Sequence, residues 1–385
     1  MLTANEAAKR LGVSVATLYA YVSRGLIRSH PDPSDPRSRL YAEEDVDRRV
    51  PGKGALHGAG PVLDSAITLI DGARLYYRGS DATELARTRS IEEVALLIWT
   101  GNMTPDAFAL TTLHVISGRG GSEGLPFVSR GASILPIVAA RDPLAYDLRP
   151  HAVAQTGWRI LNLLTSVAAE SAELADTVDE TLQQRWAPKS AQARDLIRAA
   201  LILCADHELN VSAFTARCIA SAGSNPYAVV AGGLAAMEGS KHGGMTARIE
   251  TMLDELARAR DIRAAMSERM RRGEAIAGFG HRLYPNGDPR AEVLLEMLGT
   301  RVPKLIADVA SAGEDLLREK PTIDFALVAL ARALKLPADA PITVFALGRT
   351  IGWVGQAIEQ YARDEIIRPR ARYTGPPPTT SSTFS

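Results

Sequence analysis

The sequence predicts a mainly α-helical protein in which a winged helix-turn-helix and a small β-hairpin precede a helical body. From Ile91 to Leu334, apolar residues recur near the spacings i, i+3, i+4 and i+7 that mark buried helix faces. Residues 66–79, AITLIDGARLYYRG, alternate around Asp71-Gly72, which is a strong short-range hairpin signal. Residues 1–50 contain two short helical segments with capping signals.

Length and composition indicate a globular protein of two or three units. The chain has 385 residues, of which 46% are hydrophobic and 23% charged. Its 44 basic and 44 acidic residues balance, so bulk charge favours neither nucleic acid nor membrane. Two cysteines, Cys204 and Cys218, form no disulfide framework, and the N-terminus has no signal-peptide pattern. No apolar run reaches the roughly 18 residues of a membrane span. We therefore expect a soluble, cytoplasmic protein.

The first helix begins with a capping box, in which Thr3 caps exposed amides and Glu6 reaches back. Gly12 provides a turn, and Ser14 can cap a second helix with the sequence VATLYAYVSRG. Three prolines, Pro31, Pro33 and Pro36, are expected to break the chain before RLYAEEDV. That last stretch reads as a wing strand followed by a helix.

This N-terminal unit resembles the winged helix-turn-helix of the MerR/excisionase type. The resemblance implies a DNA-facing surface made of Thr17, Tyr19, Tyr21 and Arg24, with Arg37 and Arg39 on the wing. Short helix-turn-helices also serve as packing or oligomerisation modules, and acidic residues balance the basic ones in this stretch. Both interpretations stay open.

Three further stretches read as connections. Residues 51–61, PGKGALHGAGP, form a linker between the first unit and the body. Residues 117–126, SGRGGSEGLP, lack the flanking strand and helix of a phosphate-binding loop and are interpreted as a plain loop. The tail at 376–385 has the composition of a disordered segment.

Three of the seven histidines lie in unusual settings. His207 is placed at the beginning of a helix between Asp206 and Glu208. Consecutive helical residues project about 100° apart, so these three cannot hold a metal together. HExxH, HxxxH and CxxC spacings are absent from the sequence, and no catalytic metal is expected. Alone, His207 is more often a core or interface histidine than a ligand-binding one.

His242 in GSKHGG and His281 in GFGHR lie in glycine-lined turns, where a backbone can approach a ligand closely. Together they indicate a pair of acid–base groups. The isolated Asp324 in PTIDFAL is either a helix cap or a buried base, and a cap is the commoner role. Arg349 falls within an apolar helix and needs an acid or an anionic ligand as partner.

Arg290, Arg349, Arg368 and Arg370 could hold a substrate with several carboxylates, and internal ion pairs to the many acidic residues are the alternative. Taken together, these motifs resemble the citrate synthase family over about residues 62–375. The resemblance rests on ITLIDGARLYYRGSDATELA, DHELN, KHGG, GFGHRLYPNGDPRA, PTIDFAL, ITVFALGRTIGW and IRPRARYTG, in the order of the family.

The resemblance implies a role for each motif residue. His242 would hydrogen-bond the thioester oxygen of acetyl-CoA while Asp324 removes a methyl proton. His281 would polarise the ketone of oxaloacetate. His207, Arg290 and Arg349 would hold its carboxylates, and Arg368 would reach the site of a neighbouring subunit in a homodimer. No metal or redox cofactor is implied.

The implied fold has a large domain, residues 62–247 and 341–375, and a small domain, residues 248–340, that closes over the substrates. The chain departs from the family pattern in HGGMT at 242–246, in the apolar run Ala326 to Val328, and in Pro285. At this last position many members have a cation that can meet a CoA phosphate. Two alternatives therefore remain: a 2-methylcitrate synthase using propionyl-CoA, and a DNA-binding regulator with a metabolite-sensing body.

Overall fold

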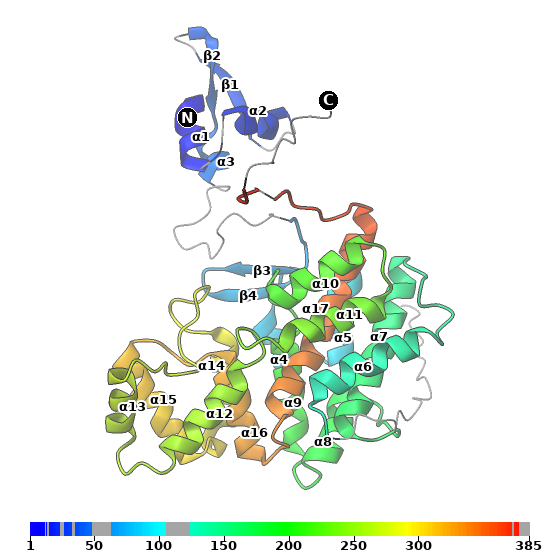
Figure 1. The fold of residues 1–385 in the computed structure, drawn as a ribbon, viewed down its shortest axis with the longest axis vertical. Coiled ribbons are helices and arrows are strands. Elements are labelled where there is room, and N and C mark those ends of the chain that lie inside the picture. The colour runs from blue at the N-terminus through cyan, green and yellow to red at the C-terminus, as the bar shows by residue number, and fades with distance from the viewer. Residues whose placement is uncertain are drawn as a thin grey trace, which may run out of the picture. The chain divides into compact units, whose positions relative to one another are not determined.

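The computed structural model describes residues 1–11, 13, 15–23, 27–32, 35–47, 63–104, 124–371 and 373–376. The chain divides into two compact units, Met1–Val62 and Leu63–Ser385 (Figure 1). The 51–61 linker, residues 117–123 of the glycine-rich stretch and the tail from residue 377 lie outside the described residues.

The first unit is a winged helix-turn-helix. Its helices are α1 (Ala4–Leu11), α2 (Val15–Ser23) and α3 (Glu43–Asp47), and its antiparallel wing consists of β1 (Ser29–Asp32) and β2 (Asp35–Tyr41). The predicted capping box is confirmed, because the Thr3 amide donates to Glu6 Oε2 at 2.9 Å and the Glu6 amide donates to Thr3 Oγ1 at 3.4 Å. A small core of its own holds this unit together; it includes Ala8, Leu18, Ile27, Tyr41 and Val46.

The expected proline break is wrong, because Pro31 and Pro36 lie within the two strands. A two-stranded sheet has only edges, where a residue without an amide proton is tolerated. Its register shifts between Pro31 and Asp32. Gly12, Ser14, Arg24 and Pro33, which the sequence singled out, lie outside the described residues.

The second unit begins with the predicted hairpin, formed by β3 (Thr68–Asp71) and β4 (Arg74–Tyr77) and extended by β5 (Ser80–Asp81). The turn is formed by Gly72 and Ala73, one residue later than the Asp71-Gly72 pair, because Asp71 pairs with Arg74. Gly72 and Ala73 have φ values of 56° and 72°, as a primed two-residue hairpin turn requires.

The rest of the body is helical, as predicted. Its helices are α4 (Ala82–Thr88), α5 (Ile91–Thr100), α6 (Phe127–Ala139), α7 (Pro150–Ala169), α8 (Val178–Trp186), α9 (Gln192–Leu203), α10 (Val211–Ser221), α11 (Pro226–Met237), α12 (Met245–Leu256), α13 (Ile262–Arg271), α14 (Pro289–Leu298), α15 (Lys304–Leu317), α16 (Ile323–Leu334) and α17 (Ala340–Arg363), with a 3-10 turn at Gly299–Arg301. No described helix is long and apolar enough to cross a membrane.

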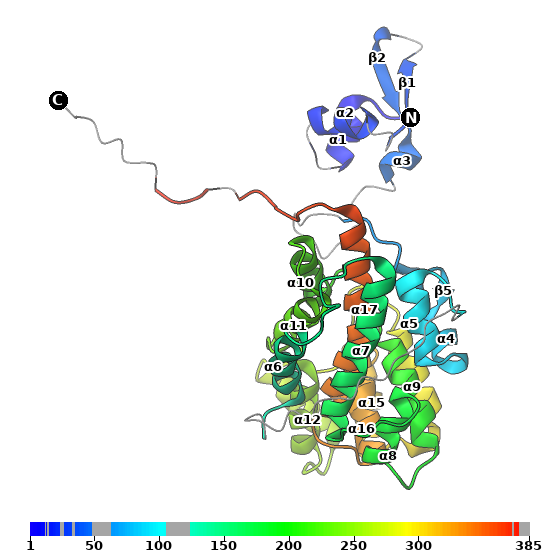
Figure 2. The same cartoon turned by 90° about the vertical axis from the view of Figure 1, so that its right-hand side faces the viewer.

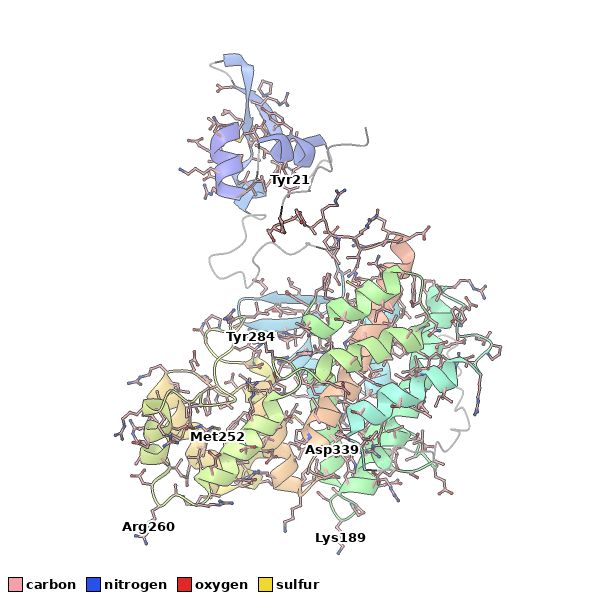
Figure 3. All side chains as sticks on the ribbon, viewed as in Figure 1. Tyr21, Lys189, Met252, Arg260, Tyr284 and Asp339 are labelled. Carbon is pink, nitrogen blue, oxygen red and sulfur yellow. The ribbon has the colours of Figure 1, made fainter. Side chains whose placement is uncertain are left out.

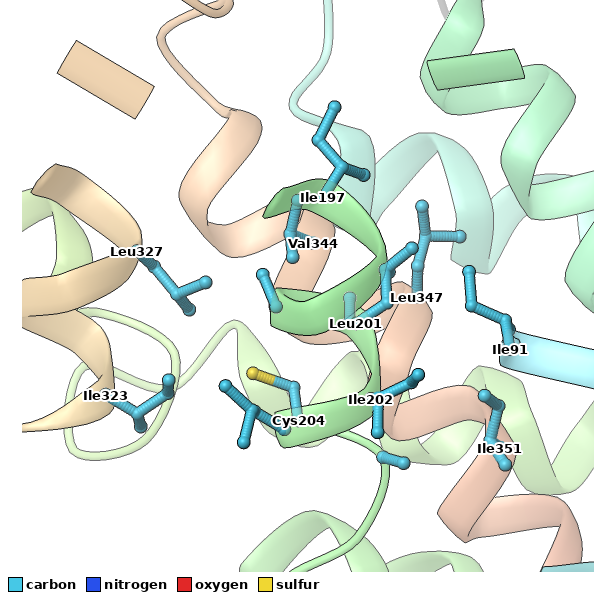
Figure 4. Packing of buried hydrophobic residues seen from close by; sticks show 14 of the residues in the cluster. Ile91, Ile197, Leu201, Ile202, Cys204, Ile323, Leu327, Val344, Leu347 and Ile351 are labelled. Carbon is cyan, nitrogen blue, oxygen red and sulfur yellow. The ribbon is translucent and has the colours of Figure 1, made fainter. Parts of the chain in front are cut away.

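Helix α17 organises the body, because α5, α7, α9, α10, α11 and α16 all pack against it (Figure 2). Close approach to α11 depends on Gly233, where an added Cβ would lie 2.5 Å from the buried Trp353 ring. Apolar side chains of α9, α16 and α17 share one core, as Leu201, Leu327 and Leu347 show (Figure 4). This core holds in place the helix ends and loops that carry the polar motifs.

Candidate active site

The polar residues singled out in the sequence come from five separate segments of the body. His207 lies between α9 and α10, His242 between α11 and α12, and His281 in the loop before α14. Asp324 is in the first turn of α16, and Arg349 is in the middle of α17. The rings of His207 and His281 meet edge to face with centroids 5.2 Å apart. The Phe345 ring contacts both the His242 ring, at 6.1 Å, and the Arg349 guanidinium, at 4.7 Å.

The His281 loop packs against the segment that leads into α16. The Gly280 amide donates to the Lys320 carbonyl at 3.0 Å, and the Thr322 amide donates to the Gly278 carbonyl at 2.8 Å. Gly278 has a φ of 89°, and an added Cβ there would crowd Ile249 and Phe325. Only glycine satisfies both the backbone conformation and the lack of space. The loop and the start of α16 thus form one piece.

Asp288 strengthens this connection. Its carboxylate accepts two hydrogen bonds from the Arg290 guanidinium, at 2.9 and 2.8 Å, one from the Arg290 amide at 3.1 Å and one from the Ile323 amide at 3.0 Å. Burial raises the pKa of Asp288, but the charge and hydrogen bonds of Arg290, the nearby His281 and the Ile323 amide together lower it more, so the net pKa lies below its usual value and the pair is ionic. Sequence reasoning missed Asp288. Its available signal was a helix N-cap in the order Asp-Pro-Arg.

His281 is a neutral hydrogen-bond donor. Burial, with the neighbouring Arg290 charge, lowers its pKa to about 4. Its Nδ1 accepts the Leu283 amide proton at 3.2 Å, so in the neutral ring the proton is on Nε2. A neutral imidazole that donates through Nε2 suits a carbonyl oxygen on which negative charge develops.

His207 does not lie in a helix, contrary to the sequence prediction. It occupies the connection between α9 and α10, next to Glu208, whose φ is 52°. Its Nε2 is 2.9 Å from the hydroxyl of Tyr284, which is buried in the His281 loop (Figure 3). Burial, with the charges of Arg290 and Arg349, keeps the pKa of His207 well below its usual value. Sequence reasoning also missed Tyr284, for which an aromatic residue in a polar loop was the only signal.

His242 is held at a close backbone crossing. A Cβ on Gly243 would lie 1.9 Å from the Met237 carbonyl oxygen, so this turn requires glycine. His242 Nε2 is 2.9 Å from the hydroxyl of the buried Ser212 on α10. Burial, together with the Arg349 charge, lowers the pKa of His242 to about 4, so this ring too is neutral near pH 7.

Asp324 is not a helix cap, and that interpretation of the sequence is wrong. Thr322 is the N-cap residue of α16, and Asp324 is the second residue of the helix. Burial raises the pKa of its carboxyl to about 6, against the opposing effect of the Arg290 charge. A carboxylate with this pKa is ionised at neutral pH and is a stronger base than an ordinary aspartate.

Arg349 places a buried charge beside these groups. Its side chain is almost fully buried, and its Nε donates to the Cys204 carbonyl at 2.9 Å. Its Nη1 has no hydrogen-bond partner among the described residues. A buried guanidinium donor without a partner is costly, so the arrangement suits an anionic ligand at this point. Burial lowers the pKa of Arg349, and the charge of Asp206 opposes that effect.

Arg368 and Arg370 are not brought to this cluster. Both are exposed, on the segment that follows α17. Among the described residues, no group of three or more His, Cys, Asp and Glu side chains could hold a metal ion.

Of the residues predicted to face DNA, Thr17, Tyr19 and Tyr21 lie on α2, and Arg37 and Arg39 lie on β2 of the first unit. Tyr19 is 54% exposed, while Thr17 and Tyr21 are partly buried. The guanidinium of the exposed Arg39 donates two hydrogen bonds to Ser29, one to Oγ at 3.0 Å and one to the carbonyl oxygen at 3.0 Å. Arg24 and the side chain of Arg37 lie outside the described residues.

Each of the two units matches a known protein family. Residues 58–115 and 150–370 match the model of the citrate synthase C-terminal domain, and residues 1–50 match a helix-turn-helix domain. The citrate synthase of Haloferax volcanii is 30% identical over 356 residues, which cover 82% of this chain and 93% of that protein. The 2-methylcitrate synthase of Shewanella oneidensis is 28% identical, with 80% and 91% covered.

A solved structure of the Thermoplasma acidophilum citrate synthase, in ternary complex with carboxymethyl coenzyme A and oxaloacetate, shares the fold. Its TM-score is 0.69 at 22% identity, and the match covers 84% of this chain and 96% of that one. The family model covers well over half of the chain, and the motifs that contain His207, His242, His281, Asp324 and Arg349 occupy one region of its body. The chain belongs to the citrate synthase family of acyltransferases.

Proposed function

We propose that this protein condenses acetyl-CoA with oxaloacetate and hydrolyses the resulting citryl-CoA to citrate and CoA. One observation carries the proposal. Two neutral histidines, His242 and His281, and the Asp324 carboxylate, whose pKa is raised, lie in one region with two buried arginines, Arg290 and Arg349. Such a set can remove a weakly acidic proton, stabilise the enol and hold a dicarboxylate. The reaction needs no metal or redox cofactor, since the CoA ester is itself a substrate.

The first step forms the enol of acetyl-CoA. The Asp324 carboxylate takes a proton from the methyl group, and the electron pair of that C–H bond moves toward the thioester oxygen. His242 donates a hydrogen bond to this oxygen through Nδ1–H. In this tautomer the Ser212 hydroxyl donates to Nε2 rather than to Asn210 Oδ1. The donor acts where charge develops, which is where a fixed hydrogen bond lowers the barrier most.

The second step forms the new carbon–carbon bond. The enol carbon attacks the ketone carbon of oxaloacetate, and the ketone oxygen takes up the proton that His281 Nε2 offers. The proton that Asp324 removed from the methyl group then replaces it, so that both His281 and Asp324 return to their starting states. His207, Arg290 and Arg349 hold the carboxylates of oxaloacetate. Water then attacks the thioester carbonyl of citryl-CoA, the C–S bond breaks, and CoA leaves as its thiol. This hydrolysis makes the overall reaction effectively irreversible.

We further propose that residues 248–340 form a small domain that closes on a large domain, residues 62–247 and 341–375. Support comes from packing within this part of the body, where α14 packs on α16, α12 on α16, and α13 on α15. His281 and Asp324 belong to this small domain, whereas His242 and Arg349 belong to the large one. Closure would complete the site only when oxaloacetate is bound.

The proposed assembly is a homodimer. Helix α11, PYAVVAGGLAAM, carries no charged residue, although Ala235 is exposed and Ala231 and Gly232 are only partly buried. A helix that is apolar on its open face is typical of an interface. The same assembly would let the exposed Arg368 enter the site of the partner subunit.

Complementation tests this role of Arg368. Arg368→Gln and Asp324→Asn should each inactivate the homodimer, but co-expression should restore activity, because one site of each mixed dimer then contains both intact residues. Random pairing predicts about a quarter of wild-type activity by thiol release. If Arg368 acts within its own subunit, the mixture stays inactive.

The proposal also states which CoA ester the protein uses, acetyl-CoA rather than propionyl-CoA. An additional methylene in a pocket changes discrimination by only about 1–3 kcal/mol, so the same catalytic groups serve propionyl-CoA in a 2-methylcitrate synthase. Release of CoA thiol, measured with acetyl-CoA and with propionyl-CoA, with and without oxaloacetate, tests the proposal. We expect oxaloacetate-dependent release that is faster with acetyl-CoA. A protein that binds oxaloacetate but releases no thiol from either ester would be a sensor rather than an enzyme.

A second proposal concerns the N-terminal unit, which we propose binds DNA through α2. Its match to a helix-turn-helix domain and the exposed Tyr19 support this. We also place the protein in the cytoplasm, since Cys204 and Cys218 are unpaired.

A gel shift with a random-sequence duplex should therefore show binding at low salt that weakens steeply as salt rises. Tyr19→Ala should weaken the shift. The matched control is Tyr146→Ala, which removes a 72% exposed tyrosine from the other unit and should leave the shift unchanged. If neither variant alters the shift, or if no shift occurs at low salt, α2 does not bind DNA.

A further inference from the structure

Tyr284 lies among the side chains that the proposed function assigns to oxaloacetate. Its side chain is buried, and its hydroxyl is 2.9 Å from Nε2 of His207. The centroid of its ring lies 4.9 Å from that of the His281 ring and 5.5 Å from the central guanidinium carbon of Arg290. One aromatic side chain thus contacts three of the groups proposed to act on this substrate.

The hydroxyl of Tyr284 is a hydrogen-bond donor to His207. Burial raises the pKa of Tyr284, so the hydroxyl keeps its proton at neutral pH. Among the described residues, His207 Nε2 is the only hydrogen-bond partner of this hydroxyl. If Nε2–H donated to the hydroxyl oxygen instead, the hydroxyl proton would be left buried and without an acceptor, which is costly. The hydroxyl therefore donates, and Nε2 is the acceptor.

This hydrogen bond determines which nitrogen of His207 carries the proton. The ring is neutral, because burial keeps its pKa well below the usual value, so it has one donor and one acceptor. With Nε2 as the acceptor, the proton is on Nδ1. This Nδ1 makes no hydrogen bond with the described residues and is not fully buried. A donor without a protein partner thus remains for an anionic ligand.

Tyr284 is itself held firmly in the loop that carries His281. Its amide donates to the His281 carbonyl at 2.9 Å, and its carbonyl accepts the Gly287 amide at 3.0 Å. Gly287 has a φ of 119°, which favours glycine, and an added Cβ there would be 2.6 Å from Lys320 Cδ. The backbone therefore fixes the direction from which the hydroxyl approaches His207, which lies on the separate connection between α9 and α10.

We propose that Tyr284 is a positioning residue, whose hydroxyl holds His207 with its proton on Nδ1 so that His207 donates to a carboxylate of oxaloacetate. The inference rests on the proposed function, because that function places oxaloacetate at His207. Tyr284 transfers no proton in this role, and it acts on the substrate only through the imidazole ring. Its contribution is to orient a donor before the substrate binds, which lowers the cost of binding.

The nitrogen NMR spectrum of protein labelled at its histidines tests the tautomer directly. The signals of His207 are those that His207→Asn removes. In the wild type, we expect the shift of a protonated nitrogen for Nδ1 and that of an unprotonated nitrogen for Nε2. In Tyr284→Phe, which removes the hydroxyl and keeps the ring, both shifts should move toward intermediate values as the two tautomers mix. A wild type protonated at Nε2, or a variant with unchanged shifts, would overturn the role of Tyr284.

Calorimetric binding of oxaloacetate tests the consequence for the substrate. We expect Tyr284→Phe to raise Kd and KM for oxaloacetate about five- to tenfold, as for the loss of one oriented donor, with kcat and KM for acetyl-CoA nearly unchanged. The matched control is Tyr227→Phe on α11, because Tyr227 is equally buried and its hydroxyl donates to Asp142 Oδ2 at 2.8 Å. This control loses a buried hydroxyl of the same kind and should leave Kd for oxaloacetate unchanged.

The role of Tyr284 and the proposed function fail in different ways. An unchanged Kd for oxaloacetate in Tyr284→Phe, or an equal rise in Tyr227→Phe, would contradict the role of Tyr284 alone. An inactive wild type whose Kd for oxaloacetate still rises in Tyr284→Phe would contradict the proposed function alone. A wild type that binds no oxaloacetate would contradict both.

Discussion

Replacing Asp324 with asparagine should lower kcat for thiol release by about a thousandfold or more, because the side chain that removes the methyl proton loses its basicity. Asparagine keeps the size of the side chain at the second position of α16. Arg290 and Arg349, the groups proposed to hold oxaloacetate, stay in place, so oxaloacetate affinity measured by calorimetry should change little. A kcat within tenfold of the wild type would remove Asp324 from its role.

The pH dependence provides a second test of Asp324. Because the ionised carboxylate is the base and burial raises its pKa to about 6, kcat should rise with pH through about 6 and then level off. The Asp324→Asn variant should not show this rise of kcat with pH.

The raised pKa of Asp324 also predicts an effect on the stability of the fold. A folded-state pKa above the usual 3.8 means that stability present at low pH is lost as pH rises through about 6. At pH 7, Asp324→Asn should therefore melt no lower than the wild type, which also shows that it folds.

Substitutions of His281 should have the next largest effect. His281→Asn places an amide near the Nδ1 position, where it can still accept the Leu283 amide proton, but it removes the donor at Nε2. His281→Gln places an amide donor closer to the Nε2 position. We expect the asparagine variant to lose about two to four orders of magnitude in kcat and the glutamine variant to lose less. Steady-state kinetics at saturating oxaloacetate measures both.

Equal losses of kcat in the two His281 variants would show that a donor at the Nε2 position is not needed for catalysis.

The dependence of stability on pH tests the protonation state of the two histidines. The pKa values of His242 and His281 are lowered from 6.5 to about 4 by burial. As pH falls, these two histidines are therefore protonated in the unfolded chain before they are protonated in the folded one. The free energy of unfolding should be highest above pH 6.5 and should fall as pH drops toward 4. Substitution of either histidine should make this fall smaller.

The sequence located the chemistry better than it located the supporting contacts. His242, His281, Asp324 and Arg349 stand out because a titratable or charged residue in a glycine turn or an apolar helix needs an explanation. The structure brings these residues into one region of the body, while their individual roles stay predictions. The family and the mainly helical fold are confirmed by the comparisons.

Contacts between distant segments were not predictable from spacing. Ser212 meets His242 across 30 residues, and Tyr284 meets His207 across 77. Asp288 reaches the amide of Ile323 across 35 residues. Two of the local errors have a similar origin. Asp324 looked like a cap because an aspartate near a helix start usually is one, but Thr322 takes that position. The prolines looked like breaks, but a two-stranded wing tolerates them.

Condensation of acetyl-CoA deuterated at its methyl group tests the central claim most directly. If Asp324 removes one methyl proton and the enol attacks oxaloacetate, the citrate formed should retain two deuterons, and Asp324→Asn should form almost none. Mass spectrometry of the product distinguishes this outcome from simple hydrolysis. Fully deuterated acetate appearing in place of citrate, with or without oxaloacetate, would contradict the assignment of His242, His281 and Asp324 to a condensation.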